Sequence, residues 1–311
     1  MSKALICGSV AYDVIMVFED HFKNHILPEK VHMLSVAFTV PRLRREFGGC
    51  AGNVAYNLNL LGESGEILAT VGADFDPYAE WLQRQGISQR HIVRLEETYT
   101  AQAYVTTDLG GNQITAFHPG AMALSDQIDV PADDGIEIAL IAPDSPDGIK
   151  KHARQLVEAG IPFLFDPGQA ITLFSGEELL ELVDQATWVA VNDYEGQLLQ
   201  HYTGLSAARI TERVEALIVT RDAEGSMIYT GSEEYIIPVA QAERVVDPTG
   251  CGDAYRAGLL YGLLQGLDWP TVGRIASLAG AYKVAHAGTQ NHRFTPDGFR
   301  ERFARHFGYR F

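Results

Sequence analysis

Asp253 ends a glycine-rich turn whose residue types suit proton transfer next to a bound anion. The turn reads Asp-Pro-Thr-Gly-Cys-Gly-Asp over residues 247–253, and apolar residues at helical spacing continue over residues 254–264. Gly250 and Gly252 let the backbone approach a ligand closely, and the free N–H groups at the start of the helix suit a phosphate. A carboxylate would repel that phosphate unless it took a proton from an attacking hydroxyl. The alternative is that Asp253 only caps the helix, a common role for Asp.

A second glycine-rich helix start occurs at residues 48–53, Gly-Gly-Cys-Ala-Gly-Asn. Apolar residues recur on one face of this segment up to Gly62, which we expect to be the C-cap. The glycines can admit a polar ligand close to the backbone, and Asn53 offers a donor and an acceptor to a pair of hydroxyl groups. The alternative is that the glycines serve only close packing.

Asp13 is a third candidate for ligand binding. It comes four residues after Ser9, where a first buried strand over residues 3–9 is expected to end. Asp13 would then lie beyond the carboxyl end of that strand, at the edge where open α/β sheets bind ligands. A position in a surface turn is the alternative.

The elements that must position these residues form an alternation of short buried strands and amphipathic helices. We expect strands at residues 3–9, 67–72, 138–142, 163–166, 188–192 and 216–220, and a strand end at residues 245–246. We expect helices at residues 53–61, 78–85, 146–159, 176–184, from 194, at 254–264 and at 274–286. This pattern predicts an α/β fold with a parallel sheet covered on both faces, and no linker or repeat divides residues 1–311 into more than one domain.

Two further segments predict a small sheet that could close over a ligand as a lid. Residues 31–46 alternate like a strand, and residues 98–117 read as a hairpin that turns at residues 109–112. We place the lid in residues 14–46 and 98–120.

Composition narrows the function classes. The formal net charge of −16 argues against nucleic acid and anionic membrane surfaces as partners. No apolar run reaches the roughly 18 residues of a membrane span and no signal peptide is visible at the N-terminus, so we expect a cytoplasmic protein. The three cysteines lack the close pairs of a zinc site or a disulfide framework.

Three motifs together resemble those of the ribokinase-like (PfkB) carbohydrate and nucleoside kinases. Residues 247–253 resemble the second signature of that family, residues 48–53 resemble the first, and Asn-Asp-Tyr-Glu at residues 192–195 resembles its Asn-x-x-Glu motif. They occur in the family's order over essentially the whole chain. The resemblance implies a three-layer α/β/α fold with a mostly parallel central sheet and a small β-sheet lid.

The resemblance also implies a role for each matching residue around the phosphoryl group. Asp253 would be the base that accepts the proton of a primary hydroxyl. Gly250, Cys251 and Gly252 would form the anion hole for the transferred phosphoryl group.

On the acceptor side, the same resemblance implies that Asp13, Gly48, Gly49 and Asn53 hold sugar hydroxyls. A stretch over residues 111–122 resembles the corresponding part of nucleoside kinases more than that of ribokinase or fructokinases.

On the donor side, the resemblance implies that Asn192 and Glu195 organise Mg²⁺ around the ATP phosphates. Thr220, Gly225 and Gly252 would lie along the nucleotide. Asp222 stands where the family has a glycine, which bears on the backbone path and on the choice of phosphoryl donor. As an alternative, Asn192 and Glu195 have the spacing of a capping box.

Many members of the family hold a potassium ion behind the anion hole, ligated largely by carbonyl oxygens. Asp247, Thr249 and Gly288 are the candidate contributors in this chain.

Phe117 is the residue on which the choice of acceptor rests. With Phe38 or Tyr104 it could stack on a nucleoside base, although aromatic residues are also common in ordinary strands. We therefore expect an ATP-dependent kinase that phosphorylates the 5′ hydroxyl of a purine nucleoside, adenosine first. The alternatives are a ribokinase- or fructokinase-type sugar kinase and a non-catalytic nucleotide or metabolite sensor. Exposed edges of the lid sheet predict a homodimer through the lid.

Overall fold

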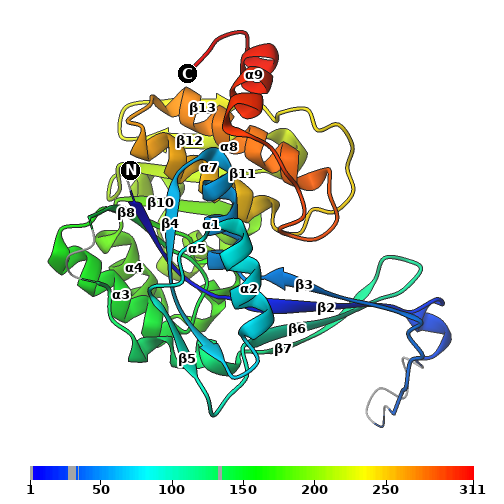
Figure 1. Ribbon diagram of the computed structural model, residues 1–311. Helices are drawn as coiled ribbons and strands as arrows, with labels where there is room; N and C mark the ends of the chain where they lie inside the picture. The colour runs from blue at the N-terminus through cyan, green and yellow to red at the C-terminus, as the bar shows by residue number, and fades with distance from the viewer. Residues whose placement is uncertain (1–2, 27–32, 34, 132–134) are drawn as a thin grey trace.

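A large twisted sheet forms the centre of the molecule. The computed structural model describes residues 3–26, 33, 35–131 and 135–311 (Figure 1). Within these residues, nine strands pair in the order β13-β12-β11-β10-β9-β8-β1-β4-β5. Their bounds are β1 (Lys3–Cys7), β4 (Ser64–Gly72), β5 (Ile92–Leu95), β8 (Ile136–Ile141), β9 (Phe163–Phe165), β10 (Trp188–Asn192), β11 (Ala216–Thr220), β12 (Ser226–Thr230) and β13 (Glu234–Ile237). All neighbours from β11 to β5 are parallel, whereas β12 and β13 pair antiparallel, so the predicted mostly parallel sheet is confirmed.

Helices cover both faces of this sheet. On one face lie α1 (Cys50–Leu61), α2 (Asp76–Gln85), α7 (Cys251–Leu264), α8 (Trp269–Val284) and α9 (Pro296–Phe307). On the other lie α3 (Pro146–Ala159), α4 (Gly176–Gln185), α5 (Asp193–Thr203) and α6 (Ala207–Thr211). Short 3-10 turns occupy Phe22–Asn24, Gly120–Gln127, Gly168–Leu173 and Asp222–Glu224. Successive residues of β1 alternate between the two cores, because side chains of a strand point to opposite faces.

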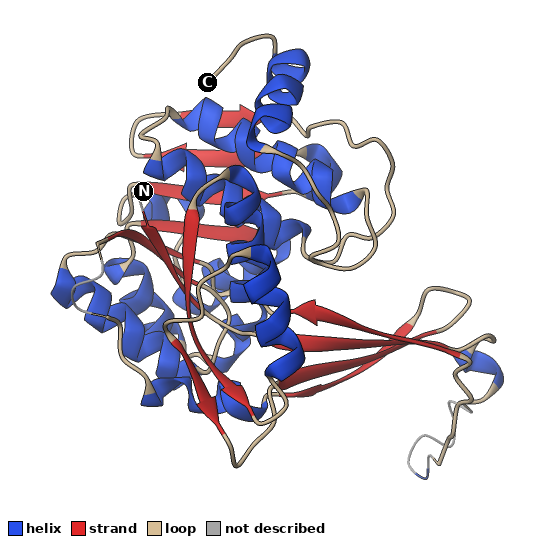
Figure 2. Ribbon diagram, viewed as in Figure 1, coloured by secondary structure: helices blue, strands red, loops and turns tan. Residues whose placement is uncertain are grey.

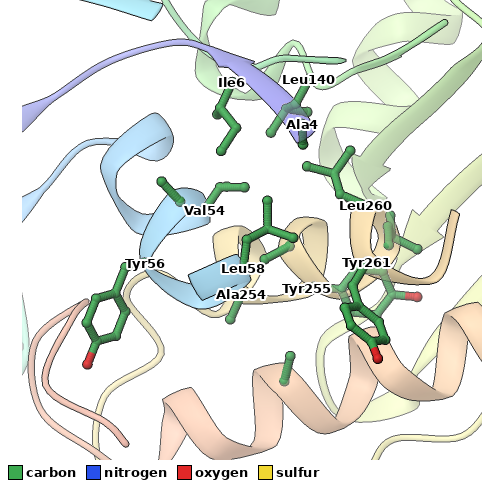
Figure 3. Close-up of a cluster of buried hydrophobic side chains, with 14 of the residues drawn as sticks. Ala4, Ile6, Val54, Tyr56, Leu58, Leu140, Ala254, Tyr255, Leu260 and Tyr261 are labelled. Atoms are coloured by element: carbon green, nitrogen blue, oxygen red, sulfur yellow. The ribbon is translucent and has the colours of Figure 1, made fainter. Parts of the chain in front are cut away.

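The packing of α1 beside α7 matters most for the site. Figure 3 shows Val54 and Leu58 of α1 in the same apolar cluster as Ala254 of α7 and Ile6 of β1. All four side chains are essentially inaccessible to solvent. Because Asn53 precedes Val54 and Asp253 precedes Ala254, this packing brings two candidate site residues from distant parts of the sequence together.

The second sheet extends away from the body as a long flat arm (Figure 2). Its order is β3-β2-β6-β7, with bounds Arg42–Gly48, Ala11–Val17, Ala101–Thr107 and Gln113–His118. The predicted lid and its hairpin are therefore present. One of its two inner strands, β2, was not predicted: its residues follow β1 so closely that Asp13 was expected only to lie beyond the end of the first strand.

Three local expectations were wrong. Residues 35–41 form no strand, and only β3 realises the strand expected within residues 31–46, of which 31, 32 and 34 lie outside the described residues. Val245 and Val246 lie in an irregular segment, and Val246 N–H bonds to the carbonyl of Val284 instead of to a strand. Helix α8 begins five residues earlier than expected, because Asp268 caps it by accepting from the N–H of Thr271. It also ends at Val284, so His286 lies outside it.

Among the described helices, none combines the length and the apolar character that crossing a membrane requires.

Candidate active site

The amino terminus of α7 lies open at the carboxyl edge of the large sheet. Gly250 precedes the helix with φ 78°, a left-handed conformation that favours glycine, and Asp253 lies in the first turn. Within the described residues, no acceptor lies on the N–H groups of Gly250, Gly252 or Asp253. Cys251 differs, since its N–H donates to the carbonyl of Pro248 at 3.0 Å. The open N–H groups and the positive end of the helix dipole suit an anion at this point.

The amino terminus of α1 is not open in the same way. The N–H of Cys50 donates to the hydroxyl of Ser9 at 3.0 Å, and the N–H of Ala51 donates to the carbonyl of Ser9 at 2.9 Å. The first two N–H groups of α1 are therefore already bonded, whereas those of Gly250, Gly252 and Asp253 at the start of α7 have no acceptor within the described residues.

Asn53 reaches across from α1 to hold the candidate base. Its Nδ2 donates to Oδ2 of Asp253 at 2.8 Å, and its Oδ1 accepts from Nε2 of Gln290 at 3.0 Å. Gln290 is fixed in turn by Trp81, whose indole N–H donates to Oε1 at 2.8 Å. Asn53 is 4% exposed. This chain of hydrogen bonds sets the orientation of the Asp253 carboxylate before any substrate binds.

Gly48 and Gly49 join the lid to α1 at a point where no side chain fits. A Cβ atom on Gly48 would collide with the carboxylate of Asp13, which lies on β2 beside it. Gly49 has φ 84°, and a Cβ atom there would stand 2.6 Å from the backbone nitrogen of Ala11. Close packing therefore explains both glycines, and the absent side chain at Gly48 is what lets the Asp13 carboxylate face the site.

Asp13 and Asp253 form a pair of partly buried carboxyl groups. Burial, together with the charges of Asp253, Glu46 and Asp247, raises the pKa of Asp13 to about 6. The pKa of Asp253 is also raised to about 6, mainly by burial, with the charge of Asp166 acting in the same direction. The hydrogen bond from Asn53 and the charge of Arg256 oppose it. A carboxylate with a pKa near 6 is ionised at neutral pH yet is a stronger base than an ordinary Asp.

A buried ion pair that the sequence reasoning missed lies under this site. Nε and Nη2 of Arg256 donate to Oδ2 and Oδ1 of Asp166 at 3.0 and 3.3 Å. Arg256 follows Asp253 by three residues on α7, and Asp166 follows the carboxyl end of β9. Two signals in the sequence could have indicated this pair. Arg256 lies at helical spacing from Asp253, and Asp166 is a carboxylate directly after a buried strand.

Asn192 and Glu195 form the capping box that their spacing allowed. Oδ1 of Asn192 accepts from the N–H of Glu195, and Oε2 of Glu195 accepts from the N–H of Asn192, both at 2.8 Å. Burial raises the pKa of Glu195, and the charge of Asp166 adds to this shift. The capping interpretation is confirmed. A role in Mg²⁺ binding is compatible with it, since Oε1 of Glu195 takes no part in the box.

Thr220 and Gly225 flank the turn where the chain departs from the family pattern. Asp222 has φ 44°, and within the described residues it is the one residue other than glycine with a positive φ. The backbone thus keeps a left-handed conformation although the glycine is replaced, and Asp tolerates that region better than most residues. Gly225 has φ 86°, and its carbonyl accepts from the N–H of Arg221 at 2.8 Å.

Asp247, Thr249 and Gly288 meet at the start of the turn that precedes α7. The Asp247 carboxylate accepts from the N–H groups of Thr249 at 3.0 Å and Gly288 at 2.9 Å. Burial acts to raise the pKa of Asp247, but these hydrogen bonds outweigh it and the pKa is lowered. Lys283, a residue that sequence reasoning did not select, donates from Nζ to the backbone carbonyl of Asp247 at 2.7 Å.

Phe117 shares a row of the lid sheet with Asp13. Asp13 pairs with Ala103 across β2 and β6, and Ala103 pairs with Phe117 across β6 and β7. Directly paired residues point to the same face of a sheet, so Phe117 faces the same side as the Asp13 carboxylate. Its side chain is 52% exposed. Phe38 and Tyr104 do not join it: Phe38 packs on Phe18 and Phe22, and Tyr104 lies on the opposite face.

Comparisons with known proteins identify the family to which the chain belongs. The family described as pfkB family carbohydrate kinase matches residues 1–296. The chain is 32% identical over 308 residues to the nucleoside kinase of Methanocaldococcus jannaschii, with 98% of each chain covered. The structure of Burkholderia thailandensis nucleoside kinase in complex with inosine matches with a TM-score of 0.90 and 48% identity, covering 99% of both chains. The same kinase in complex with ADP-inosine matches with a TM-score of 0.88 and 50% identity, covering 99% of this chain and 97% of that one.

The fold, the open helix terminus with its aspartate and these likenesses define a phosphotransferase that acts on an alcohol acceptor. The chain belongs to the pfkB family of carbohydrate kinases, and the predicted ribokinase-like fold is confirmed.

Proposed function

We propose that this chain is an ATP-dependent nucleoside kinase that transfers the γ-phosphoryl group to the 5′ hydroxyl of a purine nucleoside. The observation that carries the proposal is Asp253, held by Asn53 beside the free N–H groups of α7. Relatives named nucleoside kinases, one of them solved with inosine and with ADP-inosine, support a nucleoside as the acceptor.

In the proposed reaction Asp253 accepts the proton of the 5′ hydroxyl as the hydroxyl oxygen attacks the γ-phosphorus of ATP, and the bond from that phosphorus to the β–γ bridging oxygen breaks to release ADP. The N–H groups of Gly250 and Gly252 receive the developing negative charge of the transferred phosphoryl group, with Cys251 shaping the turn between them. Such preorganised donors stabilise the transition state without reorganising during the reaction. Asp13 and Asn53 hold and orient the ribose hydroxyls, and the absent side chain at Gly48 leaves room for the Asp13 carboxylate.

The charges around the acceptor favour a neutral molecule. Besides burial, the negative charges of Asp253, Glu46 and Asp247 raise the pKa of Asp13. The nearest arginines on β3 are already engaged, Arg44 near Asp247 and Glu46 and Arg45 with Asp74 and the ring of Tyr12. The net negative charge here would repel a phosphorylated sugar, whereas it would not repel a neutral nucleoside.

The position of Phe117 favours an acceptor longer than one sugar ring. Two strand spacings separate it from Asp13, about 10 Å. A ribose on Asp13 would leave its base near the Phe117 ring, where stacking on an aromatic face is favourable for any purine. We place adenosine first, with inosine as the nearest competitor because a close relative binds it.

On the donor side, Asn192, Thr220, Gly225 and Gly252 line the path proposed for ATP. The residues present fit Mg²⁺ bound mainly through water and phosphate, since no cluster of three metal-binding side chains occurs in the described part of the chain. Glu195 would hold such an ion, with Asn192 fixing the position of Glu195 through the capping box. Bound Mg²⁺ would neutralise charge on the phosphates.

The lid offers a surface for the proposed homodimer. Leu43, Met16, Thr106 and Ile114 form one row on the face opposite Asp13, and Leu43 and Ile114 are 63% and 44% exposed. Sedimentation velocity should show a dimer that Leu43→Asp dissociates; a monomeric wild-type chain would remove this part of the proposal.

An acceptor screen tests the main proposal. ATP consumption with adenosine, inosine, guanosine, ribose and fructose should be fastest with a purine nucleoside. A higher kcat/KM for ribose or fructose would favour the sugar-kinase alternative. Asp253→Asn should abolish turnover while nucleoside binding, measured by calorimetry, persists. Binding without turnover by the wild-type chain would instead indicate a sensor.

A further inference from the structure

Lys283 is a buried lysine on α8 whose charged end lies under the phosphoryl-transfer turn. Its side chain is inaccessible to solvent. Nζ donates to the backbone carbonyl of Asp247 at 2.7 Å and to that of His286 at 3.2 Å. Both partners are carbonyl oxygens, and the first belongs to the residue that opens the turn leading to Gly250 and Asp253.

This is the place where the family resemblance implies a potassium ion. Asp247, Thr249 and Gly288 were expected to contribute to such a site, and they do lie together. However, the Asp247 carboxylate is already occupied by the N–H groups of Thr249 and Gly288, and its backbone carbonyl accepts from Lys283. The residues present therefore do not fit a bound potassium ion, because a cation already lies on the carbonyl oxygen that the ion would need.

A lysine ammonium group can supply the same positive charge next to carbonyl oxygens that a potassium ion would supply. It carries one positive charge and donates to carbonyl oxygens, and a buried charge of this kind is tolerated when its donors are satisfied. A second monovalent cation against the same oxygen would compete with the hydrogen bond from Lys283 and would be repelled by the Lys283 charge. The nearby Arg44, whose Nη2 lies 3.7 Å from Oδ2 of Asp247, adds to that repulsion.

We propose that the ammonium group of Lys283 takes the place of a potassium ion behind the phosphoryl site, so that this kinase works without potassium. Lys283 is a positioning residue: it holds the start of the turn over residues 247–253 and contributes fixed positive charge below it. The proposal rests on the proposed kinase function, which is why the melting temperature is measured beside activity in the two assays below.

The first test uses the wild-type chain. Activity and melting temperature are measured in KCl, NaCl and choline chloride at equal ionic strength. We expect the three salts to give the same values. Activation or stabilisation by KCl over NaCl would overturn the proposal.

The second test opens the site. Lys283→Ala should lose activity in NaCl by at least about tenfold, and KCl, ammonium or methylammonium should restore a substantial part of it. KCl should also raise the melting temperature of Lys283→Ala but not that of the wild type. The matched control is Lys150→Ala, which removes a lysine paired with Glu178 on the surface and should respond to no particular cation.

Two further results with Lys283→Ala would also overturn the proposal. Full activity of Lys283→Ala in NaCl, or a folded but inactive variant that no cation rescues, would show that the ammonium does not stand in for an ion. If Lys283→Ala does not fold, crystals of the wild-type chain soaked in a thallium(I) salt replace it. We expect no thallium peak at the carbonyl of Asp247, and a peak there would overturn the proposal.

Discussion

Nδ2 of Asn53 donates to Oδ2 of Asp253 at 2.8 Å, across 200 residues of sequence. The bond joins the two glycine-led helices, α1 and α7, and fixes the carboxylate of the proposed base. Because Asn53 is held by Gln290 and Gln290 by Trp81, the orientation of Asp253 is set by residues from three separate segments.

Replacing Asn53 with Ala should slow catalysis and shift the pH profile. The lost hydrogen bond favours the charged carboxylate, so its removal raises the pKa of Asp253 and moves the acidic limb of kcat/KM to higher pH. Hydrogen bonds to charged groups are worth about 1.5–3 kcal/mol, which predicts a loss of roughly 10- to 100-fold in kcat/KM. Asn59→Ala is the control, since Asn59 lies on the same helix but bonds to the carbonyl of Gln85. Equal effects of the two variants would contradict the assigned role.

Asp253→Asn should stabilise the fold at neutral pH. The folded pKa of Asp253, about 6, lies above the ordinary value of 3.8, so the folded state binds more protons between these values and stability falls as pH rises through them. The substitution removes this cost, which is up to about 3 kcal/mol. Melting curves should show the variant above the wild type at pH 8, with the difference fading near pH 4. The surface variant Asp297→Asn is the control; a gain that does not depend on pH would count against this explanation.

Breaking the buried pair of Arg256 and Asp166 should be costly. Arg256→Met leaves a buried carboxylate without its partner, and such losses amount to about 3–5 kcal/mol. Chemical denaturation should show this loss, and adding Asp166→Asn should recover part of it. The exposed pair of Arg213 and Asp184 provides the comparison, because surface pairs contribute about 0–1 kcal/mol. The same Arg256 variant should raise the pKa of Asp253, since the arginine charge lowers it.

Alanine substitutions at the neighbouring Gly48 and Gly49 should impair different properties of the protein. Gly49→Ala forces a side chain into backbone at positive φ and should destabilise the fold by more than about 2 kcal/mol. Gly48→Ala displaces the Asp13 carboxylate and should mainly raise KM for the acceptor. Gly231→Ala places a methyl group with no atom nearby, so it should change neither the stability of the fold nor KM for the acceptor. Thermal melts and acceptor kinetics of the three variants separate these effects, and an unchanged KM in Gly48→Ala would argue against Asp13 as an acceptor ligand.

Phe117→Ala should weaken acceptor binding without destabilising the protein. Stacking of a base on an aromatic side chain is worth about 1–3 kcal/mol, so KM for a nucleoside should rise roughly 5- to 100-fold while KM for ATP stays the same. Leu109→Ala, at an exposed site in the β6–β7 turn, is the control. A KM for the nucleoside that is unaffected would leave Phe117 as an ordinary sheet residue.

The sequence alone predicted the elements whose signals are local. The strands at residues 188–192 and 216–220 and the helix at residues 146–159 were located correctly, whereas the helix expected from residue 254 begins at Cys251. Periodicity, caps and glycine turns act over a few residues, so they are visible without the fold. The three motifs, in their order, also carried the family and its ribokinase-like fold, and the PfkB match and related structures confirm both.

Only the tertiary structure decided which polar groups meet. The pairing of Arg256 with Asp166 spans 90 residues, and that of Lys283 with the Asp247 carbonyl joins the end of α8 to a distant turn. Local spacing carries no information about such contacts, because they depend on which helix packs beside which strand end. The same holds for β2, whose pairing with β3 and β6 makes it the centre of the lid and turns Asp13 toward the site.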